Sequence, residues 1–120
     1  LFVDDSEATE IIIDSMLTLF PYIELGPILS KVMSKLRING RIIIYEKDID
    51  MICHYYNKMG MGVQDINDLL FDTSGSISSV LNIETVVDRL KGLGLTIEEQ
   101  FVNSETMQSI VTARRNNNES

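Results

Sequence analysis

Hydrophobic residues first gather in the run Ile11-Ile12-Ile13, which follows an acidic opening segment. Three consecutive β-branched residues favour a strand that is buried on both faces. A helix also fits the wider stretch, because apolar residues recur at helical spacing from Ala8 to Leu19. The pattern leaves both interpretations open, and Pro21 ends whichever element precedes it.

A helical pattern is clear from Pro27 onward. Apolar residues recur on one face as far as Leu36, and Asn39-Gly40 is predicted to end the helix. The short apolar run from Arg41 to Tyr45 then predicts a strand. A helix that leads through a tight turn into an apolar strand is half of a βαβ unit, so this order predicts a parallel sheet.

The middle of the chain is predicted to be helical. Residues 48–71 favour two short helices separated by Gly60-Met61-Gly62, and residues 72–76 favour a loop. A better-marked helix follows, with Asn82 as its N-cap and Lys91-Gly92 at its end.

The end of the chain predicts a hairpin. Apolar and polar residues alternate from Leu95 to Phe101, and a second strand from Met107 to Ala113 follows the turn at residues 103–105. Strands joined by so few residues must be antiparallel, because a parallel return needs a dozen or more residues. The sheet is therefore predicted to be mixed, with parallel strands first and an antiparallel hairpin last.

Composition indicates an ordinary globular chain. Hydrophobic residues make up 44% of the 120 residues, and no apolar run reaches the length of a membrane span, so we expect no membrane partner. The net charge of −8 argues against a nucleic-acid partner, because such binding rests on neutralising phosphates. A single cysteine, Cys53, cannot form an internal disulfide, so we expect a cytoplasmic setting. One His and one Cys cannot build a zinc site from nitrogen and sulfur ligands, and no metal is expected.

Four stretches carry a family resemblance: the acidic loop and strand at Leu1–Ile13, KVMSKLRINGRIIIYE at Lys31–Glu46, NIETVVDRLKGLGLTI at Asn82–Ile97, and the closing hairpin at Phe101–Arg115. Their order resembles the carboxy-terminal half of the class I S-adenosylmethionine-dependent methyltransferases. Ile38-Asn39 departs from the Lys-Pro or Pro-Gly that is usual in the family. The resemblance implies a three-layer, Rossmann-like α/β fold with a mixed sheet, forming one domain at residues 1–115 with a polar tail at residues 116–120.

The family's main cofactor-binding motif has no counterpart in this sequence. The family binds S-adenosylmethionine through a glycine-rich turn after its first strand and an acidic residue that ends its second strand. Gly60-Met61-Gly62 lacks a preceding strand and a third glycine. The first residue is Leu1 rather than Met. We therefore expect the chain to be the carboxy-terminal portion of a fold whose first strands are absent from it, supplied by another chain, or lost.

The resemblance implies two groups of residues that bind S-adenosylmethionine: Asp4, Asp5 and Ser6 in the acidic loop, and Asp14, Ser15 and Met16 after the first strand. In the family, the first position passes the adenine and the second touches the methionine part of the cofactor. Residues 14–16 would lie at the carboxyl end of a strand, the edge where open α/β sheets bind ligands. A solvated acidic turn and an ordinary strand exit are the alternatives.

The substrate side is expected at the next strand end. Tyr45 and Glu46 would lie at the same edge, and Glu46 or Asp48 could act as a general base, although a charged loop paired with itself is the alternative. The resemblance also implies that Tyr55 and Tyr56 help to cover the substrate. Two residues adjacent on a helix point about 100° apart, so Cys53 and His54 cannot form a catalytic pair. We instead expect Cys53 and Tyr56 to pack inward, with His54 at a pocket rim.

Three functions are compatible with the sequence. The first is transfer of a methyl group from S-adenosylmethionine to an unknown acceptor. The second is a phospho-accepting receiver module, which the opening Leu1-Phe2-Val3-Asp4-Asp5-Ser6 resembles over about twenty residues. The third is a non-catalytic interaction subunit, in which an open sheet edge pairs with a second copy or with a missing amino-terminal half.

Overall fold

The computed structural model describes residues 5–71 and 77–116. The strands are β1 (Ala8–Asp14), β2 (Leu36–Lys47), β3 (Leu95–Asn103) and β4 (Gln108–Arg115). The α-helices are α1 (Leu25–Lys35), α2 (Ile49–Met59), α3 (Val63–Phe71) and α4 (Ile83–Gly92). Two short 3₁₀ helices, Leu17–Leu19 and Tyr22–Glu24, join β1 to α1. No described helix is long and apolar enough to cross a membrane.

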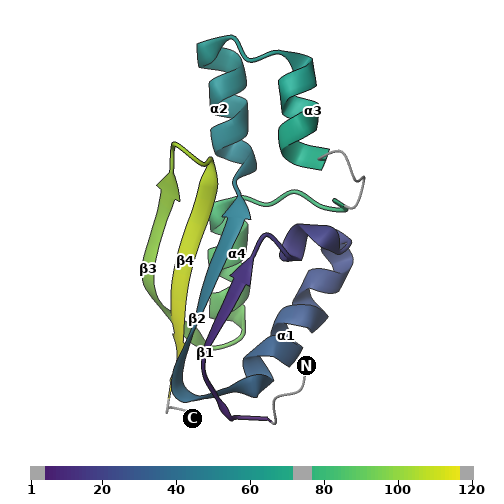
Figure 1. The fold of residues 1–120 in the computed structure, drawn as a ribbon. Helices are drawn as coiled ribbons and strands as arrows, with labels where there is room; N and C mark the ends of the chain where they lie inside the picture. Colours follow the sequence, from purple (N-terminus) through teal and green to yellow (C-terminus); the bar gives the residue numbers. More distant parts are fainter. Residues whose placement is uncertain (1–4, 72–76, 117–120) are drawn as a thin grey trace.

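The four strands form one mixed sheet in the order β1-β2-β4-β3 (Figure 1). β1 pairs with β2 in parallel, with Ile12 beside Ile43, whereas β4 pairs with both β2 and β3 in antiparallel fashion. The parallel pair and the closing hairpin confirm the prediction of a mixed sheet. The interpretation of residues 11–13 as a strand is confirmed, and the helical alternative is wrong.

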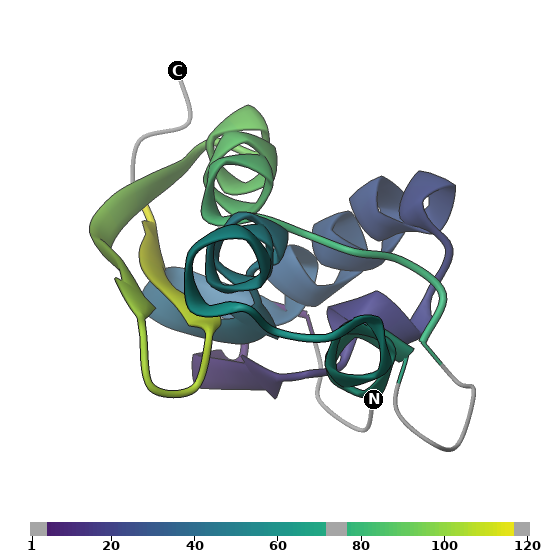
Figure 2. The ribbon, with the colours of Figure 1, turned by 90° about the horizontal axis from the view of Figure 1, so that it is seen from above.

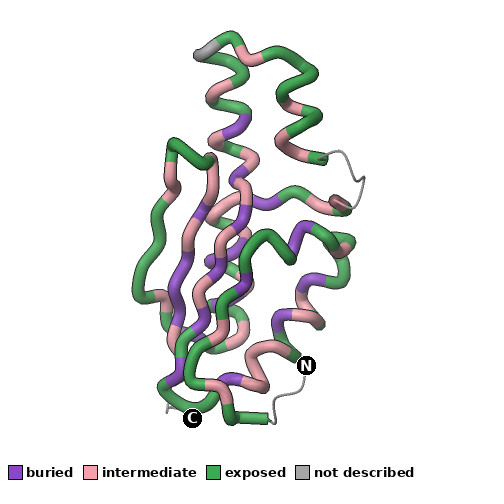
Figure 3. Tube along the Cα trace, viewed as in Figure 1, coloured by how far each residue is buried: buried purple, intermediate pink, exposed green. Residues whose placement is uncertain are grey.

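Both α1 and α4 lie on one face of the sheet, as the view from above shows (Figure 2). The core lies between these helices and the strands: Leu29 of α1 and Leu90 of α4 are 2% and 1% exposed, and Ile44 of β2 is fully buried. Buried positions accordingly recur along β2, β4, α1 and α4 (Figure 3). Within the described residues, the helices α1 and α4 thus form one layer on one face of the sheet.

The opposite face of the sheet has no helix over it within residues 5–71 and 77–116. Ile12 is 57% exposed on this open face, and Phe101 is 45% exposed. The expectation that residues 11–13 are buried on both faces is therefore wrong for this chain, although Ile13, on the helix-covered face, is only 7% exposed.

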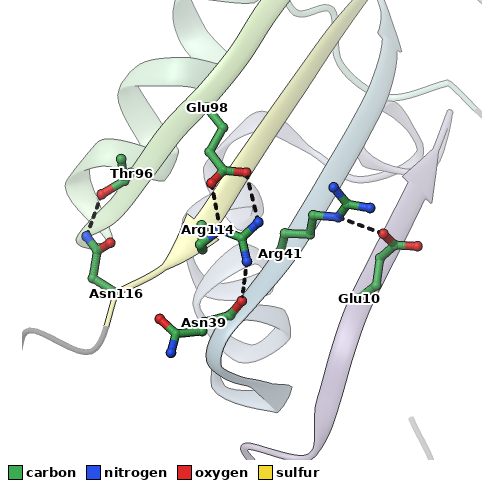
Figure 4. A network of polar contacts seen from close by, with 7 residues as sticks. All are labelled: Glu10, Asn39, Arg41, Thr96, Glu98, Arg114 and Asn116. Carbon is green, nitrogen blue, oxygen red and sulfur yellow. Dashed lines mark hydrogen bonds and ion pairs between the residues drawn. The ribbon is translucent and has the colours of Figure 1, made fainter.

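Ion pairs occupy one end of the open face (Figure 4). Arg41 of β2 donates to Glu10 of β1 at 2.8 Å. Arg114 of β4 pairs with Glu98 of β3 at 2.6 Å and also donates to the carbonyl of Asn39. These contacts join all four strands near one end of the sheet.

The helix α1 ends earlier than its pattern predicts. It ends at Lys35, so Leu36 and Asn39-Gly40, which were predicted to lie at the end of the helix, belong to β2. Asn39 has a φ of 68°, and the pairing of β1 with β2 shifts register there. Asn39-Gly40 therefore makes an irregularity within the strand rather than the turn between helix and strand.

A bulge in β3 places Phe101 differently from its predicted face. The alternation from Leu95 would put Phe101 on the same face as Leu95, but the β3–β4 register shifts between Ile97 and Glu99. One extra residue reverses the side chains that follow it. Leu95 is consequently in the core, whereas Phe101 lines a shallow groove of the open face with Tyr45.

The predicted polar tail begins with a residue that has defined contacts. The side-chain amide of Asn116 donates to the Thr96 hydroxyl. The rest of the tail, residues 117–120, and the predicted loop at residues 72–76 lie outside the described residues.

Candidate functional site

The ends of β1 and β2 lie side by side at the carboxyl edge of the parallel strands. Asp14 is the register partner of Tyr45, and the backbone N–H of Ser15 donates to the carbonyl of Tyr45 at 2.8 Å. Ser15 adopts a φ of 57°, which turns the chain out of the strand, and its hydroxyl donates to the Asp14 carboxylate at 3.0 Å. The structure therefore brings residues 14–16 to the same edge as Tyr45 and Glu46.

Glu46 is fully buried and holds the loop that follows β1. Its Oε2 accepts hydrogen bonds from the backbone N–H groups of Met16 at 3.0 Å and Leu17 at 2.9 Å. The hydroxyl of Thr18 lies 3.5 Å from Oε1. Alternation along β2 explains this position, because Glu46 follows Ile42 and Ile44 on the helix-covered face.

Burial raises the pKa of the Glu46 carboxyl to about 7, and the negative charge of Asp14 acts in the same direction. The hydrogen bonds from Leu17, Met16 and Thr18 favour the ionised form and oppose that rise in pKa. A carboxyl that titrates near neutral pH can hold or accept a proton under ordinary conditions.

A cavity of about 130 Å³ lies beside Glu46, between the loop after β1 and the segment that precedes α4. The lining residues are Ser15, Thr18, Leu19, Glu46, Lys47, Ile49, Leu70, Ile77, Ser79 and Val80. The backbone N–H groups of Ser78 and Ser79 donate to the carbonyl of Thr18, at 2.7 and 3.1 Å, and join the two walls. Lys47 donates to the carbonyl of Leu69 near the end of α3, which fixes the helical wall.

Asp48, the second candidate base, has a structural role. Its Oδ2 accepts from the backbone N–H of Met51 at the start of α2, and its Oδ1 accepts from that of Ile83 at the start of α4. Asp48 is 2% exposed, so this one carboxylate caps two helices from within the fold. Both oxygens are thus occupied by backbone donors, which disfavours a role as base.

The two predicted cofactor groups lie at opposite ends of β1. Ser6 donates its backbone N–H to the carbonyl of Ser34, and the Asp5 carboxylate pairs with Lys35 at 2.8 Å, both near the end of α1. Asp4 lies outside the described residues. The structure therefore does not bring Asp5 and Ser6 together with residues 14–16.

The remaining candidate residues at this edge do not share one site. Tyr45 lines the groove on the open face, so it does not share the cavity that Glu46 lines. Ser15 lines the cavity, whereas Met16 lines an apolar groove between β1 and α1. Asp14 is exposed.

The aromatic residues of α2 lie away from the cavity. Tyr55 donates its hydroxyl to the carbonyl of Ser104 in the turn between β3 and β4, at 3.2 Å, and Tyr56 is 43% exposed. The expectation that Cys53 and Tyr56 pack inward is wrong, because Cys53 is exposed and Ile52 is the buried residue within positions 49–58 of this helix. His54 lines a groove beside Tyr55, which agrees with its expected place at a pocket rim.

Sequence reasoning did not find Thr18 and Ser79 in the cavity. Neither residue belongs to a motif, and their proximity comes from hydrogen bonds between loops about 60 residues apart. Asp48 was identified from the sequence as a candidate base. Its capping of both α2 and α4 could not be predicted, because it depends on how the end of β2 meets the start of α4.

Comparison with solved structures shows the fold to be that of part of a class I S-adenosylmethionine-dependent methyltransferase. A methyltransferase of Methanosarcina mazei matches 97% of this chain and 63% of its own length, at 15% identity and a TM-score of 0.67. The 1,6-didemethyltoxoflavin-N1-methyltransferase of Burkholderia thailandensis, solved with S-adenosylhomocysteine, matches 95% of this chain and 46% of its own, at 11% identity and a TM-score of 0.65. An O-methyltransferase family 2 protein of Planctomyces limnophilus, in complex with apigenin, matches 90% and 30%, at 15% identity and a TM-score of 0.66.

The chain spans between about a third and two-thirds of the length of these structures. No family model matches it, and no curated protein matches its sequence. At 11 to 15% identity these likenesses establish the fold.

Proposed function

We propose that the chain is the carboxy-terminal portion of an S-adenosylmethionine-dependent methyltransferase, and that it contributes the β1–β2 carboxyl edge to the cofactor site. The observation that carries this proposal is the adjacency of Asp14 and Ser15 to the end of β2, within a fold matched along nearly all of its length by methyltransferases. Open α/β sheets bind ligands at this edge.

The residues at the edge suit one part of the cofactor. S-adenosylmethionine carries a positive sulfonium and an amino group, and bound there it would supply an electrophilic methyl group. Asp14 offers an exposed carboxylate that complements this positive charge, and its hydrogen bond from Ser15 orients it. The glycine-rich turn that would hold the nucleotide half has no counterpart in this chain.

Positioning is the main task of such a site, because methyl transfer is an in-line displacement. Glu46 fixes the loop at Met16 and Leu17 and thereby fixes the edge at which Asp14 is presented. Its raised pKa also suits it to take a proton from an acceptor group in the neighbouring cavity.

An amino-terminal half would complete the fold in two places. β1 is an edge strand, and an apolar groove of about 490 Å³ beside it is lined by residues that include Ile11, Phe20 and Val32. The open face presents Ile12 and Phe101 to solvent. We propose that this half adds a parallel strand beside β1 and helices over the open face, in agreement with the partial coverage of the matched structures.

Amide NMR of the ¹⁵N-labelled chain, titrated with S-adenosylhomocysteine, tests the cofactor edge. Saturable shifts are expected at residues 14–17, and Asp14→Asn should weaken them. Asp88→Asn, which changes an exposed carboxylate on α4, is the matched control and should leave them unchanged. Shifts confined to residues 5–7, or no saturable shift at millimolar ligand, would contradict the proposal.

A non-catalytic interaction subunit is the second candidate, favoured by the same open edge and face. Pairing of two copies through β1 would make the mass in solution depend on concentration. The receiver module is disfavoured, because the closing hairpin of β3 and β4 has no place in that fold. The single cysteine, Cys53, remains the reason to propose a cytoplasmic setting.

A further inference from the structure

Two carboxylates from neighbouring strands meet at the loop that follows β1. Asp14, the last residue of β1, is the register partner of Tyr45, the residue before Glu46 in β2. The Oε2 atom of Glu46 accepts the backbone N–H groups of Met16 and Leu17, at 3.0 and 2.9 Å. One residue separates Asp14 from the two that Glu46 binds. The strand pairing and these hydrogen bonds therefore hold the two carboxylates in a defined arrangement.

The two carboxylates differ in their surroundings. Glu46 is fully buried, whereas Asp14 is exposed. No Lys, Arg or His among the described residues forms an ion pair with Glu46. A buried carboxyl without a cation favours its protonated form, and a second negative charge nearby favours that form further. Both effects raise the pKa of Glu46, to about 7, so Glu46 is the member of the pair that gains or loses a proton near neutral pH.

The other described residues beside Glu46 have contacts of their own. Lys47 lines the same cavity, and its ammonium donates to a backbone carbonyl of α3 at 2.8 Å. Asp48 accepts, through its two oxygens, from the backbone N–H groups at the starts of α2 and α4. On β4, the register partner of Glu46 is the uncharged Ser109. Asp72 lies outside the described residues and is tested by substitution below.

We infer that the proposed cofactor edge releases a proton when it is filled, because a positive group bound at Asp14 neutralises that charge and Glu46 then ionises. This inference concerns the regulation of the proposed cofactor site and rests on the proposed function. The O–H bond of the Glu46 carboxyl breaks, its electron pair stays on the carboxylate, and the proton passes to solvent. The ionised carboxylate is the stronger acceptor for the N–H groups of Met16 and Leu17, so binding would also tighten the loop.

The amide signals of Met16 and Leu17 report the charge of Glu46 without any ligand. In NMR titrations of the ¹⁵N-labelled chain, both signals should follow one transition with a midpoint near pH 7, and Glu46→Gln should abolish it. Asp14→Asn should lower the midpoint by about half a pH unit, because it removes the nearby negative charge. Asp88→Asn, at an exposed position of α4, is the matched control and should leave the midpoint unchanged.

The same titration can overturn the inference. An unchanged midpoint in Asp14→Asn would show that the charge of Asp14 does not act on Glu46. A lower midpoint in Asp72→Asn, with no change in Asp14→Asn, would assign the effect to a charge away from the cofactor edge. Asp14→Asn is a change of similar shape at an exposed position, so the test holds even where Glu46→Gln does not fold.

Calorimetric titration with S-adenosylhomocysteine measures the proton release itself. Binding enthalpies at pH 7, compared between buffers of different ionisation enthalpy, should show about 0.3 proton released per ligand, which corresponds to a fall of about half a unit in the pKa of Glu46. Glu46→Gln should bind without this release. Binding without proton release in the unchanged chain would overturn the inference and leave the proposed function standing. Absence of binding would overturn the proposed function and, with it, the inference.

Discussion

The carboxylate of Glu46 accepts a hydrogen bond from the backbone N–H of Leu17 at 2.9 Å, and so connects the end of β2 to the loop after β1. The two residues are 29 positions apart in the sequence. Leu17 is 2% exposed, so the loop is held by a buried polar contact and by packing at the same point. The geometry of the candidate site therefore depends on Glu46 even where Glu46 touches no ligand.

The free energy of unfolding should depend on pH through Glu46. The pKa of the Glu46 carboxyl is about 7 in the folded chain, against an ordinary value of 4.5, so the folded state binds more protons than the unfolded state between these two pH values. The stabilisation by the protonated carboxyl is therefore complete below about pH 4.5 and is lost as the pH rises through about 7. We expect a loss on the order of 2 kcal/mol between pH 5 and pH 8.

Glu46→Gln tests this dependence, because the amide keeps the shape and does not ionise. Urea unfolding at several pH values between 5 and 8 should show a clearly smaller decline for this variant than for the unchanged chain. Glu99→Gln, at an exposed position of β3, is the control and should keep the decline. An identical pH profile for Glu46→Gln and the unchanged chain would show that Glu46 does not titrate as proposed.

Asp48→Ala should destabilise the fold by about 2–3 kcal/mol. The substitution leaves the backbone N–H groups of Met51 and Ile83 without their acceptor, at the starts of two helices. Asp88→Ala, an exposed change on α4, should cost less than about 0.5 kcal/mol. Chemical denaturation measures both, and similar costs for the two variants would refute the double-capping role.

Ile12 and Ile13 form a matched pair that reports which sheet face is covered. In this chain Ile13→Ala should cost about 3 kcal/mol, because Ile13 is 7% exposed in the core. Ile12→Ala should cost about 1 kcal/mol or less, because that side chain is 57% exposed. In a longer natural polypeptide whose amino-terminal half covers this face, the cost at Ile12 should rise toward that at Ile13. Equal costs of Ile12→Ala in the two polypeptides would argue against that cover.

Arg115→Met should lower the free energy of unfolding by about 1 kcal/mol, because it removes the guanidinium and keeps most of the apolar stem. The Arg115 guanidinium donates to the carbonyls of Met33 and Leu36, which lie where α1 meets β2. Arg37→Met, at an exposed position nearby, is the control for loss of a positive charge. Thermal unfolding should separate the two variants, and a shared small effect would mean that the Arg115 contacts add nothing.

The sequence predicted those features that depend on local patterns. The N-cap at Asn82 and the antiparallel hairpin follow from neighbouring residues, and Asn82 accepts from the Thr85 backbone N–H as expected of a cap. The strand at residues 11–13 was one of two interpretations that the pattern left open, and the structure decides between them. The resemblance to methyltransferases rests on four sequence stretches that occur in the family's order along the chain, and the structural matches agree with it.

Features that depend on tertiary contacts could not be predicted. The bulge at Glu98–Glu99 reverses Phe101, and no local signal in the alternating pattern marks it. The resemblance implied that Asp5 and Ser6 bind the same cofactor as residues 14–16, but β1 separates the two groups by its whole length. Ser79 lies at the cavity wall because its backbone N–H donates to the carbonyl of Thr18, a contact between segments far apart in the sequence.

Calorimetric titration of S-adenosylhomocysteine into the natural polypeptide that contains residues 1–120 tests the central proposal most directly. We expect binding near micromolar affinity, weakened about ten-fold or more by Asp14→Ala, which removes the carboxylate that we propose pairs with the ammonium group of S-adenosylhomocysteine. Asp88→Ala should leave the affinity unchanged. A folded polypeptide that does not bind S-adenosylhomocysteine, or that binds it equally well without the Asp14 carboxylate, would contradict the account.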